Sequence, residues 1–320
     1  MRCSRFAPGT NDNTTGTFGL SAGFGDVDSV RTMQDRSSPS PAVVVGIDGS
    51  RSAIDAALWA VDEAVSRDVP LRLIYAIDPA CADTDPRDAA RDLARAEVAV
   101  RHAFTEVEAT DKPVKIEVEI LQEPPTRALL TAARSAALLC VGAMGLKHCS
   151  QGRIGSTAAA VASSTHCPVA IVRGHDPIRT QHQWVVAEVD ATTGSDGVLR
   201  RALEEARLRN VPLRVLTAWQ SRYTDIHDGN AVADGNRLAR AQLDRRLAQW
   251  KKRYPDVDMH TAAVNGNTLN FLAKNASSIQ LLVVGHERRE GVAALVGPPG
   301  LAALQNAECS VLICERQNVL

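Results

Sequence analysis

Long hydrophobic runs, paired cysteines and an excess of charge of either sign are all missing from this chain of 320 residues. No apolar stretch approaches the roughly 20 residues of a membrane-spanning helix, so we expect no membrane span. A formal net charge of −1 argues against a general nucleic-acid binder, because a phosphate backbone is bound by a basic face.

The seven cysteines form no C-x-x-C pair and no zinc-like spacing with histidine. No apolar core follows Arg2 and Arg5, as a secretory signal would require, and we expect a cytoplasmic location.

Residues 1–40 differ in composition from the rest of the chain. They are rich in Gly, Ser, Thr, Asn and Asp and show almost no apolar periodicity, which predicts a disordered segment. Met33 is an alternative start of translation. The formal G-x-S-x-G match at Gly19–Gly23 lacks the strand and helix that a nucleophile elbow needs, and we interpret it as chance.

An internal repeat organises the remaining chain. The stretch Val43–Asp48 (VVVGID) returns as Val185–Asp190 (VVAEVD), 142 positions further on. The same offset carries Pro70-Leu71-Arg72 onto Pro212-Leu213-Arg214 and Cys167 onto Cys309. Agreement at one offset over so long a span predicts two duplicated domains rather than a solenoid.

Each copy is expected to alternate strands with helices. In the first copy we expect strands at 42–48, 71–77, 114–121, 138–141 and 168–172, and helices at 52–67, 86–109, 125–135 and 156–164. The strands are continuous apolar runs, which indicates burial on both faces. The prediction is an α/β fold of two tandem doubly wound, Rossmann-like parallel-sheet domains. Domain 1 is expected at 41–173, a linker at 174–182 and domain 2 at 183–315.

Ligands of such sheets bind beyond the carboxyl ends of the strands, and candidate residues gather there in the first copy. Asp48 ends the opening strand, where its carboxylate can accept hydrogen bonds from ribose hydroxyls or, alternatively, cap the next helix. Gly142 and Gly145 follow a buried strand, and Gly155 and Ser156 precede a helix, so backbone N–H groups there suit phosphate. The positive charge of this loop lies at Lys147, His148 and Arg153.

This combination resembles the universal stress protein family, and specifically its tandem-domain members. The family's ATP motif, G-x2-G-x9-G-[ST], is matched by Gly142, Gly145, Gly155 and Ser156. The resemblance covers nearly everything from Ala42 to Cys314 and implies an adenine nucleotide hydrolase-like fold that binds ATP with magnesium. It places adenine near Ala76, ribose on Asp48 and phosphates on the backbone of 142–145 and 155–157. The nucleotide-binding residues expected in the first copy are Gly46, Asp48, Ala76, Gly142, Met144, Gly145, Leu146, Lys147, His148, Gly155, Ser156 and Thr157.

The second copy departs from the motif. Gly285 and Gly297 align with Gly142 and Gly155, but the middle glycine is missing and Gly291 comes late. Pro298 and Pro299 replace Ser156 and Thr157, which removes two N–H donors, and Glu188 replaces Gly46. We therefore expect weak or no ATP binding by the counterpart residues Asp190, Ala218, Gly285, Gly291 and Gly297.

Three functions remain open from the sequence. The first is a non-enzymatic ATP-binding regulator, in which slow ATP hydrolysis stays possible. The second is an adenylate-forming or nucleotide-transferring enzyme, whose usual S-G-G-x-[DS] loop and H-x-G-H pair are absent from the sequence. The third is a scaffold whose nucleotide only rigidifies a dimer. The family resemblance favours the first and implies homodimers, stress regulation and a regulatory protein partner of unknown identity.

Overall fold

Strands and helices alternate through the first repeat of the computed structural model. The strands are β1 (Ala42–Ile47), β2 (Leu71–Ala76), β3 (Ile116–Leu121), β4 (Ala136–Gly142) and β5 (Val169–Val172). The helices are α1 (Arg51–Arg67), α2 (Pro86–Glu108), α3 (Pro125–Ala133) and α4 (Ser156–Ser164). These bounds lie within two residues of those that the sequence predicts, and those of α4 agree at both ends.

The second repeat follows the same order. Its strands are β6 (Trp184–Glu188), β7 (Leu213–Trp219), β8 (Met259–Asn265), β9 (Ile279–Gly285) and β10 (Ser310–Cys314). Its helices are α5 (Asp196–Arg209), α6 (Gly229–Arg253), α7 (Thr268–Asn275) and α8 (Gly291–Val296). The structure describes residues 41–79, 86–145, 154–174, 183–190, 195–220, 229–287, 291–297, 300 and 309–315. The N-terminal segment 1–40 and most of the expected linker therefore lie outside the described residues.

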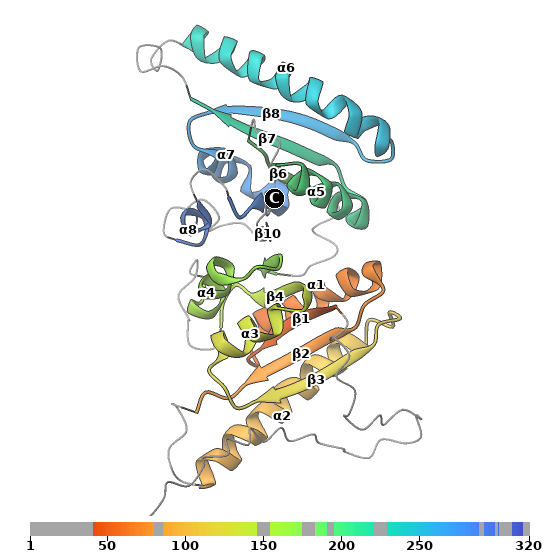
Figure 1. Cartoon of the computed structure of the whole chain (residues 1–320), viewed down its shortest axis with the longest axis vertical. Helices are drawn as coiled ribbons and strands as arrows, with labels where there is room; N and C mark the ends of the chain where they lie inside the picture. Colours follow the sequence, from red (N-terminus) through yellow and green to blue (C-terminus); the bar gives the residue numbers. More distant parts are fainter. Residues whose placement is uncertain are drawn as a thin grey trace, which may run out of the picture. The chain divides into compact units, whose positions relative to one another are not determined.

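The strands join in one sheet with the order β3-β2-β1-β4-β5-β10-β9-β6-β7-β8 (Figure 1). Pairing within each repeat is parallel, with β1 between β2 and β4 and with β6 between β7 and β9. In each half the strand order reverses at the first strand, which is the position where doubly wound sheets open a crevice for ligands.

Helices cover both faces of this sheet. One core packs α1, α2, α5 and α6 against the sheet, and the other packs α3, α4, α7 and α8 against the opposite face. Fully buried residues of β1 enter both cores, Val43 and Val45 on one face and Val44 on the other, which explains its continuous apolar run. Among the described residues, no helix is both long and apolar enough to span a membrane.

Local capping fixes the ends of α1. Ser50 accepts a hydrogen bond from the backbone N–H of Ala53, so Ser50, and not Asp48, is the N-cap. The helix ends at Asp68, which adopts the left-handed conformation (φ 53°) and donates its N–H to Ala64. Asn210 ends α5 in the same way (φ 52°), because Asp and Asn tolerate this conformation better than most residues.

The two repeats meet along their last strands. β5 and β10 pair antiparallel, with Ile171 opposite Val311 and Val169 opposite Ile313. The sequence predicts two parallel sheets but not this antiparallel seam, which merges them into one.

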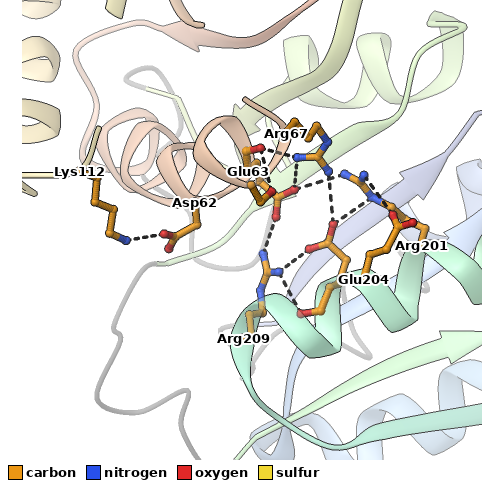
Figure 2. Close-up of polar contacts among 9 residues, drawn as sticks. Asp62, Glu63, Arg67, Lys112, Arg201, Glu204 and Arg209 are labelled. Atoms are coloured by element: carbon orange, nitrogen blue, oxygen red, sulfur yellow. Dashed lines mark hydrogen bonds and ion pairs between the residues drawn. The ribbon is translucent and has the colours of Figure 1, made fainter. Parts of the chain in front are cut away.

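A buried charge cluster lies between α1 and α5 beside this seam (Figure 2). Glu63 of α1 contacts Arg67, Arg201 and Arg209 at 2.6, 3.3 and 3.0 Å. Glu205 of α5 pairs with Arg201 at 2.9 Å and also with Arg209. The side chains of Glu63 and Glu205 are 0% and 1% exposed. Glu205 and Arg209 of the second repeat correspond to Glu63 and Arg67 of the first. The same helical ion pair is therefore present in both repeats, and the two pairs contact each other.

The carboxyl groups of Glu63 and Glu205 have pKa values that are shifted in opposite directions. Burial raises the pKa of Glu205 to about 7, and the charge of Glu63 adds to this rise. Burial alone would raise the pKa of Glu63 as well, but Arg209, Arg67 and Arg201 together outweigh it and lower the pKa to about 2. The folded chain therefore keeps a proton on Glu205 that the unfolded chain releases at a lower pH.

Glu205→Gln should change how stability depends on pH. A carboxyl whose pKa is raised on folding stabilises the fold below its unfolded pKa of 4.5, and this contribution is lost as pH rises towards 7. The wild type should therefore lose up to about 3 kcal/mol between pH 4.5 and 7 that Glu205→Gln does not lose. Urea unfolding of both proteins from pH 5 to 8 measures the difference. Glu204→Gln, at a half-exposed neighbour, is the control, and an unchanging gap between wild type and Glu205→Gln contradicts the assignment.

Candidate functional site

A cavity of about 530 Å³ opens at the carboxyl ends of β1, β2 and β4. Its position is the point where the strand order of the first repeat reverses. Its volume lies in the range of small-molecule and cofactor sites. Nine residues that the sequence singles out line it: Gly46, Asp48, Ala76, Gly142, Met144, Gly145, Gly155, Ser156 and Thr157. The other three, Leu146, Lys147 and His148, lie outside the described residues, as does Arg153.

Asp48 is held in place by the turn that leads into α1. Its Oδ1 accepts the backbone N–H of Ser50 at 2.9 Å. Its Oδ2 lies 2.8 Å from the position that a Cβ on Gly145 would take. Glycine at 145 thus leaves room for the carboxylate beside the loop that follows β4.

The start of α1 also anchors this loop. Ser52 Oγ accepts the backbone N–H of Met144 at 3.3 Å, and Ser50 Oγ donates to the carbonyl of Met144 at 3.3 Å. A Cβ on Gly142 would lie only 2.6 Å from the backbone carbonyl of Ser52. Gly142 therefore permits a close approach between the end of β4 and the first turn of α1.

The N-terminus of α4 faces the cavity. Gly155 is its N-cap in extended conformation (φ −61°, ψ 151°), and no side chain caps this end. The N–H of Gly155 donates to Ala143 at 2.8 Å, so it is already used within the protein. The first helical bond runs from Ala159 to Gly155, which leaves the N–H groups of Ser156, Thr157 and Ala158 without a helical acceptor. These three residues line the cavity and are its candidate anion donors.

Small residues shape the other end of the cavity. Gly46 and Ala76 lie on neighbouring strands, and Leu129 of α3 packs so close to Gly46 that an added Cβ would lie 3.1 Å from it. Thr126, at the start of α3, adds a hydroxyl to this wall. The result is an apolar slot between β1, β2 and α3.

Besides Ser50 and Thr126, four polar residues that line the cavity were missed from the sequence. They are Tyr75 of β2, Asp78, which follows β2, and Asp92 and Arg95 of α2. Burial raises the pKa of Tyr75; Arg95 partly offsets this rise, and Asp48 and Asp92 add to it. The only sequence signal for Asp92 and Arg95 is their spacing of three on a helix, which is typical of a solvent-exposed ion pair.

The second repeat has a different arrangement at the corresponding positions. Gly297 follows α8, and its N–H donates to Ala293 at 2.8 Å. Asp190 is engaged by Ser195, whose Oγ donates to Oδ1 at 2.6 Å. Pro298 and Pro299 lie outside the described residues.

An aromatic side chain follows Ala218 in the second repeat. Trp219 takes the place of Ile77, packs directly against the backbone of Gly235 in α6 and donates its indole N–H to Asn236 at 2.7 Å. Gly285 ends β9 as Gly142 ends β4, and Gly291 begins α8 with φ +71°. Gly285 thus occupies the same place in its repeat as Gly142, whereas Gly291 begins a helix.

Comparison with known proteins assigns the family. Residues 41–173 and 183–315 each match the profile described as the Universal stress protein family. The chain belongs to the universal stress protein family, with two of its domains in tandem.

Relatives of similar length occur in Mycobacterium tuberculosis. The chain is 50% identical to universal stress protein Rv2028c over 289 residues, which cover 88% of this chain and 99% of that protein. It is 47% identical to universal stress protein Rv3134c over 270 residues, with coverage of 83% and 96%. The crystal structure of a universal stress protein from Archaeoglobus fulgidus has a TM-score of 0.63 at 16% identity and covers 87% of this chain and 97% of its own. The structural similarity shows that this chain and the Archaeoglobus fulgidus protein share a fold.

Replacing Gly142 with alanine should destabilise the first repeat. The added methyl group would meet the backbone of Ser52, which cannot move without shifting α1, and the expected loss is about 2 kcal/mol or more. Gly155→Ala is the matched control, because its Cβ would approach nothing closer than 3.7 Å and the expected loss is below about 1 kcal/mol. Urea unfolding measures both, and equal losses would contradict the close approach at Gly142.

Proposed function

We propose that this universal stress protein is an ATP-binding stress-response regulator whose nucleotide lies in the first repeat. The observation that carries the proposal is the cavity at the ends of β1 and β4, where the spaced glycines and the open N-terminus of α4 come together.

The charge of α4 supports phosphate binding at this end. The free N–H groups of Ser156, Thr157 and Ala158 coincide with the positive end of the helix dipole. The hydroxyl groups of Ser156 and Thr157 can donate to the same phosphates. Magnesium would enter with ATP and neutralise part of the phosphate charge.

The shape of the other end supports a purine. The cavity wall beside Gly46, Ala76 and Leu129 is apolar, as a purine ring requires. Asp48, on the same cavity wall, could then accept hydrogen bonds from ribose.

The second repeat supports one nucleotide per chain. Pro298 and Pro299 take the places of Ser156 and Thr157 and have no N–H to donate, and Glu188 takes the place of Gly46. Any homodimer would need a surface other than the seam, because β5 and β10 pair with each other inside the chain. The regulatory partner would recognise the occupied first repeat.

Ser156→Pro should weaken ATP binding at least tenfold while preserving the helix. Proline removes one N–H donor but is favoured at the first helical position, and the extended ψ of Gly155 suits the residue before proline. Ser156→Ala keeps the N–H and loses only the hydroxyl. Isothermal titration of nucleotide-free protein with Mg-ATP should give one site per chain, at least tenfold weaker binding for Ser156→Pro and a smaller change for Ser156→Ala.

Two results would overturn the proposal. The first is no binding of ATP by the wild type together with no nucleotide released from the purified protein by mass spectrometry. The second is equal affinity of wild type and Ser156→Pro, because then the N-terminus of α4 does not hold the phosphates.

A further inference from the structure

The cavity extends past the strands towards α2. On this side its wall is formed by Tyr75, Asp92 and Arg95, which belong neither to the glycine motif nor to the apolar slot. A phenol, a carboxylate and a guanidinium together offer both donors and acceptors, as recognition of hydroxyl groups requires.

Asp92 is a positioned carboxylate. Arg95, one turn further along α2, donates to its Oδ1 at 3.4 Å. The side chain of Asp92 is 26% exposed and that of Arg95 is 61% exposed, so the arginine forms the outer rim and the carboxylate lies deeper. Both residues line the same cavity as Tyr75 and Asp48.

Asp48 is already engaged in part within the protein. Its Oδ1 accepts the N–H of Ser50 at 2.9 Å. A ribose presents two adjacent hydroxyl groups, and each needs an acceptor once water is excluded. Asp92, a further carboxylate on the cavity wall, would supply an additional acceptor.

We propose that Asp92 accepts a hydrogen bond from the ribose of the bound nucleotide, so that the first repeat distinguishes ribonucleotides from 2′-deoxyribonucleotides. Arg95 is the positioning residue that orients Asp92, and Tyr75 closes the sugar pocket from the strand side. This inference rests on the proposed ATP site. A site built to bind a hydroxyl group disfavours the analogue that lacks it, because its own polar group is then left unpaired.

The same helix offers a matched control. Asp88 and Arg91 form an equivalent pair three residues apart at 3.2 Å, but they are not part of the cavity wall. Asp92→Ala and Asp88→Ala therefore remove the same chemical group and the same kind of ion pair from α2. Only the first removes a group that faces the ligand.

The test compares the affinities of ATP and 2′-deoxy-ATP by isothermal titration. Wild type and Asp88→Ala should bind ATP at least tenfold more tightly than 2′-deoxy-ATP. Asp92→Ala should reduce this ratio to about two or less, mainly by weakening ATP. Arg95→Gln should lower the ratio in part, whereas Arg91→Gln should leave it unchanged.

Three outcomes would overturn the inference. Equal affinities in the wild type would show that the site ignores the 2′-hydroxyl. An Asp92→Ala variant with the same ratio of ATP to 2′-deoxy-ATP affinity as the wild type would show that another residue recognises the 2′-hydroxyl. Equal weakening of both nucleotides by Asp92→Ala would make Asp92 a structural residue of the cavity. In each case ATP still binds the wild type, so these results are distinct from failure of the ATP site itself.

Discussion

The ion pair cluster between α1 and α5 is the constraint on which the arrangement of the two repeats depends. Two glutamic acid side chains and three guanidinium groups are buried together, and their ion pairs offset part of the cost of desolvation. Arg201 takes the place of Trp59 in the repeat and contacts both Glu63 and Glu205. Trp59 lies under the guanidinium of Arg209 at 4.8 Å. The joint therefore brings together corresponding helices of the two repeats that differ in side chains such as Trp59 and Arg201.

Pairing within the chain allows the two repeats to differ. The pairing of β5 with β10 requires both repeats to be folded, but it does not require a ligand-binding cavity in either of them. In the first repeat the glycines let Asp48, α1 and the end of β4 approach one another around an open cavity. In the second, Trp219 packs against α6 and Ser195 engages Asp190. We infer that one repeat keeps the ligand site while the other serves mainly as its structural partner.

Local features were predictable from the sequence, and long-range features were not. Neighbouring residues determine two of the elements, the strand with Val43-Val44-Val45 and the start of α4 at Gly155–Ser156. Both elements are therefore found where the sequence pattern predicts them. Glu63 has the sequence appearance of an ordinary charged residue on a helix, because its counterpart Glu205 lies 142 positions away. Asp92 was missed for the same reason: only the packing of α2 beside β2 brings it to the cavity. The expectation that Asp48 is a ligand rather than a cap agrees with Ser50 being the N-cap, although ligand binding itself stays a prediction.

The central claim is that a nucleotide binds the first repeat and not the second. Photoaffinity labelling with an ATP analogue that carries an azide on its adenine ring, followed by peptide mapping, tests it most directly. We expect labelled peptides from the end of β2 and the start of α3 in the first repeat, around Ala76 and Thr126. Equal labelling of the peptide that contains Ala218 and Trp219, at the end of β7, would contradict it.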